Sequence, residues 1–305
     1  MFTLFFVLLF AQEPIDPIPL KIKNINKEKA ILGKILFFDP ILSKDKKIAC
    51  VSCHKPQCGG ADCVQYSIGV FERSDKPMNA PTVYNARYNC WQFWNGRAKD
   101  LKEQAMMANH DPEEMDMDKK TLEKRLNSSL KYKSLFKRVY NKDYITDDMV
   151  YDAIAEFEKT LITPNCKFDR YLRGDKNALS EKEKRGYFLF KSYGCITCHN
   201  GINIGGNSFQ KLGVFIKDIK IPRGLDRYEV TKRKEDKYVY KVPTLRNIAL
   251  TAPYFHNGSV KSLKKAIYLM GKYNLGIDIP KEDINYIEAF LKTLTGEIPE
   301  ILRGK

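Results

Sequence analysis

The pentapeptide C-V-S-C-H at positions 50–54 returns as C-I-T-C-H at positions 195–199. A repeated C-x-x-C-H is the attachment motif of c-type haem, in which two thiols on one helical turn form thioethers with the haem vinyl groups. The histidine that follows becomes an axial ligand of the iron. We therefore expect two covalently bound haem c groups, held by Cys50, Cys53 and His54 and by Cys195, Cys198 and His199.

Two other interpretations fit a pair of C-x-x-C sequences. A zinc ribbon would use the four thiols as ligands, but its pairs usually lie about 15–20 residues apart. A redox dithiol is the second alternative, and neither explains the histidine after both pairs. The other cysteines allow three disulfide pairings, one of which closes a short loop between Cys58 and Cys63. We expect these four to be structural or free rather than reactive: Cys58, Cys63, Cys90 and Cys166.

The length of 305 residues and a hydrophobic content of 43% suit two compact domains, one for each haem motif. Most apolar residues recur at helical spacing, so the predicted fold is mainly α, with two cytochrome c-like haem domains and long loops. Pro164 marks the expected boundary because it stops a helical pattern. The predicted domains are an N-terminal haem domain at 21–164 and a C-terminal haem domain at 165–305.

The periodicity predicts several helices in detail. Ile31, Leu32, Ile35 and Leu36 form one apolar face of a helix that stops before Pro40. A second helix is capped at residue 146 and continues towards residue 164, and a Ser-Glu capping box opens a third at residue 180. A last helix ends near residue 296. The region 201–241 is richer in Gly and β-formers and is expected to be loop or a short hairpin.

Residues 1–11, M-F-T-L-F-F-V-L-L-F-A, form an apolar run that is too short to cross a bilayer and ends in a small residue. We interpret residues 1–20 as a signal peptide and N-terminal lead, which predicts a periplasmic protein. The usual positive charge before the apolar run is missing, so an uncleaved membrane tether is the alternative. Covalent haem attachment also favours export.

The formal net charge of +15 comes mostly from lysines that are distributed along the whole chain. Because they form no block, the charge does not indicate a nucleic-acid partner. A basic surface attracts acidic partners and speeds their encounter, which suits docking of a small redox protein. A generally solvated lysine surface is an equally good interpretation.

The second iron has two candidate sixth ligands, because Met270 is the only methionine and His256 the only histidine downstream of its motif. Met270 shares a helical face with Leu263 and Ile267, and a Met/His ligand pair raises the haem potential. Core packing is the alternative role for Met270.

The first iron is expected to lack a strong sixth ligand. Before the domain boundary, His110 is the only histidine outside the haem motif. The other candidate sixth ligands of this iron are Met106, Met107 and Met115. An open iron position beside a carboxylate can bind and protonate a small oxidant. Glu113 and Glu114 could supply the carboxylate, although a solvated acidic loop explains them as well.

Further motifs occur in the order in which the bacterial dihaem cytochrome c peroxidases have them, and the chain resembles that family from about residue 30 to residue 298. The matching segments are L-G-K at 32–34, L-F-F-D-P at 36–40, S-I-G at 67–69, N-A-P-T-V at 79–83, Q-F-W-N-G-R at 92–97, P-E-E-M at 112–115, N-G at 200–201, V-P-T-L-R-N at 242–247 and T-A-P-Y-F-H-N-G-S at 251–259. Their order and density make the resemblance specific.

The resemblance implies a periplasmic enzyme that reduces hydrogen peroxide to water with two electrons from a small cytochrome c or cupredoxin. It places peroxide at the N-terminal haem and electron entry at the C-terminal haem, whose ligands match His199 and Met270. Trp94 matches a tryptophan between the haems, and Glu114 matches the acid of the peroxide pocket. His256 matches a histidine near the C-terminal haem that is expected to be a neighbour rather than a ligand.

The resemblance also implies features between the domains. Asn79, Thr251 and Pro253 match a calcium site, where one side-chain oxygen and backbone carbonyls suit a hard cation. The tail after about residue 296 is expected to pack against the first domain. A homodimer is the expected assembly, while the oligomeric state and the identity of the donor stay open on sequence alone.

One position departs from the family. Many relatives carry a histidine after S-I-G that blocks the peroxide haem until the other haem is reduced, and here that position is Val70. Valine cannot ligate iron, so we expect the first haem to be open in the oxidised protein.

We hypothesise that Glu114 transfers a proton between the two peroxide oxygens while an electron arrives through Trp94. One alternative is a non-catalytic dihaem electron carrier. Another is a relative of the methylamine dehydrogenase maturation enzyme, which oxidises side chains of a partner protein and has tyrosine in place of the axial methionine. The presence of Met270 favours the peroxidase.

Overall fold

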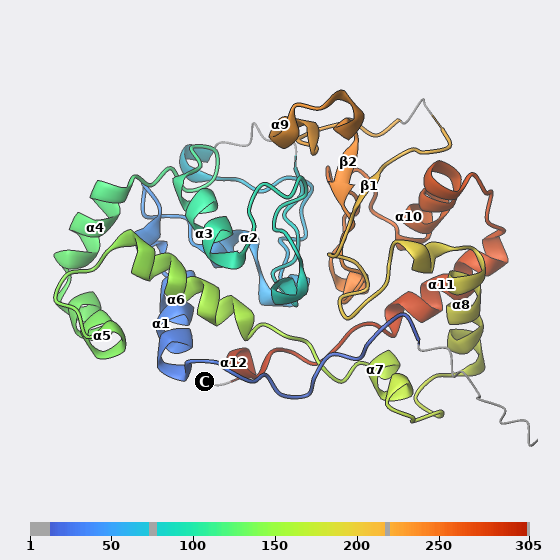
Figure 1. Ribbon diagram of the computed structural model, residues 1–305, viewed down its shortest axis with the longest axis horizontal. Coiled ribbons are helices and arrows are strands. Elements are labelled where there is room, and N and C mark those ends of the chain that lie inside the picture. Colours follow the sequence, from blue (N-terminus) through green and yellow to red (C-terminus); the bar gives the residue numbers. More distant parts are fainter. Residues whose placement is uncertain (1–12, 73–77, 217–219, 304–305) are drawn as a thin grey trace, which may run out of the picture.

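The computed structural model describes residues 13–72, 78–216 and 220–303, which form two helical lobes side by side (Figure 1). The predicted mainly α fold is confirmed. The N-terminal lobe holds α1 (Lys27–Phe37), α2 (Cys50–Cys53), α3 (Leu101–His110), α4 (Lys119–Asn127), α5 (Leu130–Tyr140) and α6 (Asp147–Lys159). The C-terminal lobe holds α7 (Lys167–Leu172), α8 (Glu181–Ser192), α9 (Tyr228–Thr231), α10 (Leu263–Met270), a π-helix at Gly271–Leu275 and α11 (Lys281–Lys292).

Where the sequence predicted loop or a short hairpin, the C-terminal lobe has a two-stranded antiparallel ribbon whose strands are joined by a long connection that includes α9. β1 (Phe209–Lys211) pairs antiparallel with β2 (Val239–Lys241), and Phe209 lies opposite Lys241 in the register. This short ribbon lies on the side of its lobe that faces the N-terminal lobe (Figure 1). None of the helices in the described parts of the chain is long and apolar enough to span a bilayer. The apolar run at residues 1–11 lies outside the described residues.

Each lobe is built around a close crossing of two helices. In the N-terminal lobe α1 packs on α6, and a Cβ added to Gly33 would lie 1.9 Å from the carbonyl oxygen of Ala153. In the C-terminal lobe α8 packs on α11, and a Cβ added to Gly186 would lie 2.0 Å from the carbonyl oxygen of Tyr286. Only glycine allows such an approach of two backbones, so each crossing depends on one small residue.

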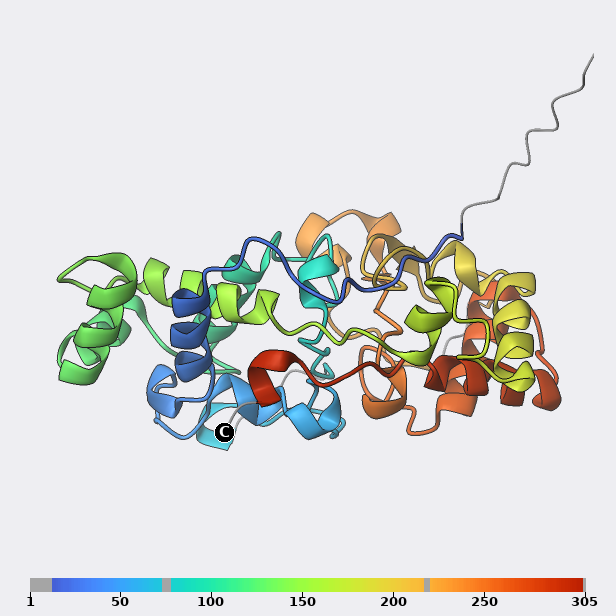
Figure 2. The ribbon, with the colours of Figure 1, turned by 90° about the horizontal axis from the view of Figure 1, so that it is seen from below.

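Three extended segments connect the lobes: the lead before α1, the linker after α6 and the tail after α11 (Figures 1 and 2). The lead is bonded to the C-terminal lobe by the fully buried Arg246, which donates to the carbonyl of Asp16 at 2.8 Å and pairs with Asp169 at 2.6 Å. The tail ends in α12 (Glu300–Arg303), where the carbonyl of Ile301 accepts a bond from Lys34 on α1. The described parts of the lead and of the tail therefore each contact the lobe to which they do not belong in sequence.

Some local predictions need correction. Ile31 is 49% exposed although it belongs to the predicted apolar face, because α6 covers only the side of α1 that carries Leu32 and Leu36. Thr146 precedes α6 as predicted, but its side chain makes no capping bond. The capping box of Ser180 with Glu183 is confirmed at the start of α8.

Candidate functional site: two cavities with a shared wall

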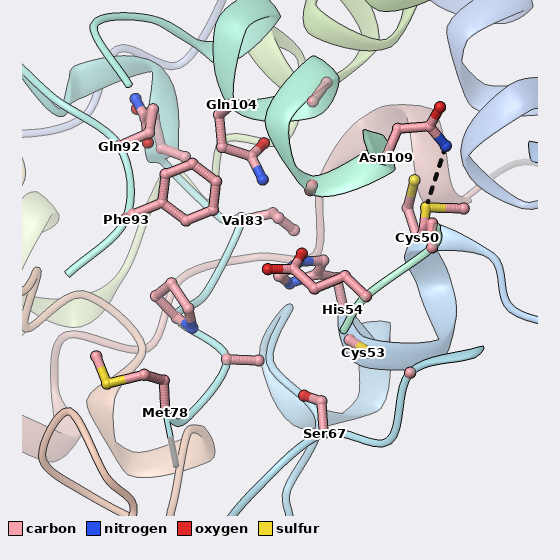
Figure 3. Close-up of a pocket in the computed structure, with 18 of the residues that line it drawn as sticks. Cys50, Cys53, His54, Ser67, Met78, Val83, Gln92, Phe93, Gln104 and Asn109 are labelled. Carbon is pink, nitrogen blue, oxygen red and sulfur yellow. Dashed lines mark hydrogen bonds between the residues drawn. The ribbon is translucent and has the colours of Figure 1, made fainter. Parts of the chain in front are cut away.

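The first cavity, of about 180 Å³, opens in front of α2 in the N-terminal lobe. Figure 3 shows Cys50, Cys53 and His54 on one side of it and Gln92, Phe93 and Gln104 on another. α2 follows the extended residue Ala49 and is one turn long, which brings both thiols of the first C-x-x-C pair onto the cavity wall. The predicted haem residues of this motif are thus assembled around one largely apolar space.

His54 is oriented by a backbone bond. Its Nδ1 lies 3.1 Å from the carbonyl oxygen of Gly60, which can only accept, so Nδ1 carries the proton and Nε2 is the nitrogen whose lone pair could bind iron. The carbonyl of Pro81 is a second backbone partner of the ring. Burial lowers the pKa of His54, which favours the neutral imidazole that metals bind. Gly60 lies within a loop closed by a disulfide between Cys58 and Cys63, one of the three pairings that the sequence allowed.

Three acidic side chains of the described residues line the first cavity. Glu114 forms an ion pair with Arg97 at 3.6 Å and is 38% exposed, so it reaches both the cavity and solvent. Glu113 and Glu158 each bury one carboxylate oxygen that has no hydrogen-bond partner among the described residues. Burial raises the pKa of Glu158 to about 8. The first cavity can therefore hold and release protons.

The structure changes the candidates for a sixth ligand here. His110 is exposed, does not line the cavity, and its Nε2 lies 2.9 Å from the hydroxyl of Tyr151 on α6. The wall contains Met115 and, unpredicted, Met78, but not Met106 or Met107. Val70 is fully buried, and it is the neighbouring Gly69 that lines the cavity.

The second cavity, of about 260 Å³, lies in the C-terminal lobe and contains Cys195, Cys198 and His199 in its wall. His199 repeats the arrangement of the first site, because its Nδ1 lies 3.4 Å from the carbonyl oxygen of Ile204. Burial lowers its pKa to about 4, so the imidazole is neutral. In place of a disulfide, the loop behind it is held by Thr244, whose hydroxyl donates to the carbonyl of Asn203 at 2.6 Å.

α10 presents the predicted methionine to the second cavity. Leu263, Ile267 and Met270 all line it, as their spacing on one helical face predicts. The π-helix follows directly after Met270, and such widened turns often occur at functional sites. A soft thioether and a neutral imidazole therefore line the same apolar space.

His256 lines the second cavity as well, but a stacked aromatic ring and a backbone carbonyl hold its imidazole. It is 2% exposed, stacks on Tyr240 with centroids 4.1 Å apart, and its Nε2 lies 2.7 Å from the carbonyl of Pro222. Because that carbonyl can only accept, Nε2 carries a proton and cannot bind a metal.

Trp94 belongs to the walls of both cavities. Its indole nitrogen donates to the carbonyl of Asn79 at 2.8 Å, and its own carbonyl accepts from the backbone of Lys241 at 2.7 Å. Asn79 lines both cavities too. Trp94 is thus held from both lobes, its side chain by Asn79 and its backbone by Lys241.

Each cavity fits a haem c. The walls are mainly apolar, each offers two thiols beside one imidazole, and each imidazole keeps its Nε2 free. The zinc interpretation is wrong, because the two C-x-x-C pairs line different cavities, and no three His, Cys, Asp or Glu residues of the described chain are placed to hold a metal ion.

The three residues assigned to calcium by resemblance lie near the shared wall. Asn79, Thr251 and Pro253 all line the second cavity, and the amide nitrogen of Asn79 donates to the carbonyls of Val64 and Gln65. This orientation leaves the Asn79 side-chain oxygen available.

Several wall residues were not predicted from the sequence: Met78, Gln104, Glu158 and Lys241. Only Glu158 had a usable signal, since it lies four residues after Ile154 on the same face of α6.

Comparisons with known proteins agree with this geometry. A family model described as di-haem cytochrome c peroxidase matches residues 27–177. The cytochrome c551 peroxidase of Nitrosomonas europaea is 48% identical over 291 residues, which cover 95% of this chain and 86% of that protein. The methylamine utilization protein MauG of Methylophilus methylotrophus is 32% identical, covering 92% of this chain and 87% of that protein. Among solved structures, a MauG-like protein associated with microbial copper homeostasis superposes with a TM-score of 0.80 at 26% identity, covering 92% of this chain and 93% of that one.

Proposed function

The chain belongs to the di-haem cytochrome c peroxidase family and is a cytochrome c peroxidase that acts on hydrogen peroxide, and we propose a separate task for each of its two cavities. The first cavity receives peroxide and supplies protons, and the second receives electrons. The observation that carries this division is the placement of acids: Glu113, Glu114 and Glu158 line the first cavity, and no Asp or Glu of the described chain lines the second.

The haems would be held by the cysteine pairs and by the free Nε2 atoms of His54 and His199, and their irons supply redox chemistry when bound. At the first site, Glu114 would accept a proton from one peroxide oxygen and return it to the other, which leaves as water when the O–O bond breaks. The two electrons that this cleavage needs would come from the donor by way of the haems, and two further protons would convert the remaining oxygen to a second water. Arg97 keeps the carboxylate of Glu114 in place through their ion pair.

Phe93 limits water at the first site. Its ring lies on the cavity wall, and the guanidinium of Arg97 sits 3.4 Å from the ring centroid. The amide of Gln104 faces the same space and can donate a hydrogen bond to a bound oxidant.

At the second site, His199 and Met270 would hold the haem iron between them, and a Met/His ligand pair would keep that iron closed to peroxide and raise its potential. The wall between the sites suits electron transfer, because the indole of Trp94 is in both walls and is fixed by its bond to Asn79. The electron reaches the first site through this side chain.

The function is tested with the holoenzyme and a reduced small acidic cytochrome c under anaerobic conditions. We expect steady oxidation of the cytochrome when peroxide is added, with two cytochromes consumed for each peroxide. Electron exchange without peroxide consumption would make the protein a carrier. Solvent extraction of the denatured chain should leave two haems attached, and repeating the assay with a reduced cupredoxin separates the two classes of donor.

We further propose a calcium ion bound by the side-chain oxygen of Asn79 and the carbonyls of Thr251 and Pro253. Because these donors are neutral, waters must complete the shell and the affinity is modest. Calorimetric titration of chelator-treated holoenzyme with calcium should show one site per chain, and Asn79→Leu should lose it. Absence of heat in the unaltered protein would refute the site.

The proposed setting is the periplasm, supported by the Cys58–Cys63 disulfide, since such bonds persist in oxidising compartments. Fractionation of cells after osmotic shock should release the protein, and retention in the membrane fraction would favour the tether. A homodimer is proposed as the assembly, and sedimentation of the holoenzyme decides it.

A further inference from the structure

Lys241, the last residue of β2, is a buried basic residue that has no role in the mechanism proposed above. Only 5% of the residue is exposed, and it lines the second cavity. Its side chain has neither a hydrogen bond nor an ion pair to any described residue. Lysine is rarely buried without an anionic partner, since transferring an ammonium group out of water is costly.

The walls around Lys241 do not supply that anion. Apart from Lys241 itself, the described lining of the second cavity contains no Asp, Glu, Lys or Arg. The two histidines in it, His199 and His256, are neutral, because burial lowers the pKa of both. Burial likewise lowers the pKa of Lys241 to about 8, and nothing in its surroundings raises it again. An anionic partner for the Lys241 ammonium group must therefore come from the molecule that occupies the cavity.

A haem brings two propionate carboxylates into a site whose walls are otherwise uncharged. We propose that Lys241 binds a propionate of the second haem and holds its negative charge inside the cavity. This inference rests on the proposed function only in requiring a haem at Cys195, Cys198 and His199. It makes Lys241 a positioning residue for the cofactor, joined to it by a charge-assisted hydrogen bond.

The same contact has a consequence for electron transfer. The backbone N–H of Lys241 donates to the carbonyl of Trp94, so a propionate that holds the Lys241 side chain also steadies the strand that fixes Trp94. A positive charge near the second iron opposes its oxidation, which gains a further positive charge. Lys241 therefore raises the reduction potential of the second haem relative to the first.

The test compares the holoenzyme with Lys241→Met, Lys241→Arg and Lys211→Met. Lys211 lies on β1 of the same hairpin, where it is exposed, so its removal controls for a general loss of surface charge. Spectroelectrochemistry measures the potential of each haem. We expect a lower potential for the second haem in Lys241→Met alone, near-normal values in Lys241→Arg and Lys211→Met, and an unchanged first haem.

Reduced-minus-oxidised infrared spectra supply a second readout. The carboxylate bands of the second haem's propionates should shift in Lys241→Met and not in Lys211→Met. Unchanged potentials and bands in Lys241→Met would overturn the proposal. If that variant lacks its second haem, Lys241→Gln is measured by the same criteria. A peroxidase-inactive unaltered holoenzyme would refute the proposed function, whereas normal turnover with no shift would refute only the role of Lys241.

Discussion

The two cavities share an attachment motif and a histidine bonded to a backbone carbonyl, but the charges on their walls are opposite. Three glutamates and one arginine line the first, and a single lysine is the charged residue in the described wall of the second. Acids allow a site to move protons, while an isolated cation favours the reduced iron. The same cofactor can thus perform two tasks because the surrounding side chains differ.

The supports behind the two histidines differ as well. The Cys58–Cys63 disulfide closes the loop that carries the Gly60 carbonyl, whereas hydrogen bonds of Thr244 hold the corresponding loop of the second lobe. The covalent closure fixes the loop whose Gly60 carbonyl orients the His54 ring, which suits the proposed role of this site in binding and releasing peroxide. At the second site, where we propose that His199 and Met270 both hold the iron, hydrogen bonds alone support the corresponding loop.

The largest expected effect comes from removing the proton carrier of the first cavity. Glu114→Gln should lower peroxide turnover by about 10²–10⁴-fold, because general acid-base groups typically contribute that much. Both haem spectra and the second haem's potential should be unchanged. Glu113→Gln, one residue earlier in the same loop, is the matched control and should retain most turnover. The reverse result would transfer the proton role to Glu113.

The second prediction concerns the open and closed irons. Electron paramagnetic resonance of the oxidised holoenzyme should show one high-spin and one low-spin haem, and rapid mixing should show reaction with peroxide before any reduction. The wall of the first cavity contains no histidine besides His54, and methionine binds ferric haem weakly.

Two low-spin signals and no reaction until one electron is added would contradict an open first iron. Met78→Leu and Met115→Leu then identify the closing ligand, because the variant that lacks it should become high-spin. His110→Gln is the control, since His110 does not line the cavity and its Nε2 faces Tyr151.

The third prediction separates the lobes by their helix crossings. Gly33→Ala should destabilise the N-terminal lobe and Gly186→Ala the C-terminal lobe, each by about 1–3 kcal/mol or more, because an added methyl overlaps a backbone carbonyl. Urea unfolding followed at each haem's own absorption band measures the two lobes separately. Ser192→Ala, at the exposed end of α8, should change neither. Equal loss at both haems would mean that the lobes unfold as one unit.

The fourth prediction removes the covalent support of the first lobe. The disulfide closes a loop with a sequence separation of 5, and the entropy of so short a loop corresponds to about 2 kcal/mol. Cys58→Ala with Cys63→Ala should therefore lower the unfolding midpoint seen at the first haem and leave the second unaffected. Cys90→Ala, which removes an exposed free thiol, is the control. A shift at the second haem would show that the loop also supports the contact between lobes.

The sequence predicted the features that depend on local spacing. Three such features are the haem motifs, the capping box at Ser180 and the face of α10 that carries Met270. Each is recognised from residues that lie within one or two helical turns of one another in the sequence. Ile31 was misjudged because the apolar stripe of α1 is wider than its contact with α6.

The charged wall residues could not be predicted in this way. Lys241 is one of 52 lysines and arginines, and its burial arises only when the hairpin packs between the lobes. Met78 reaches the first cavity from a loop whose path depends on contacts with the other lobe, such as the bond from the Leu225 backbone to its sulfur. Tertiary packing, rather than sequence pattern, therefore gives the two cavities their opposite charges.

The smallest stability change, counted per pH unit, is a pH dependence confined to the first lobe. Burial raises the pKa of Glu158 from 4.5 to about 8, so the folded lobe keeps this proton while the unfolded chain releases it. The free energy of unfolding should fall by up to about 1.4 kcal/mol per pH unit between these values and level off above pH 8. Glu158→Gln cannot ionise and should remove that slope. Glu156→Gln, whose carboxylate accepts from the Asn26 backbone and from Lys159, should leave it in place. Urea titrations from pH 5 to pH 8 decide the matter, and a slope that survives in Glu158→Gln would assign the first cavity's proton uptake to another acid.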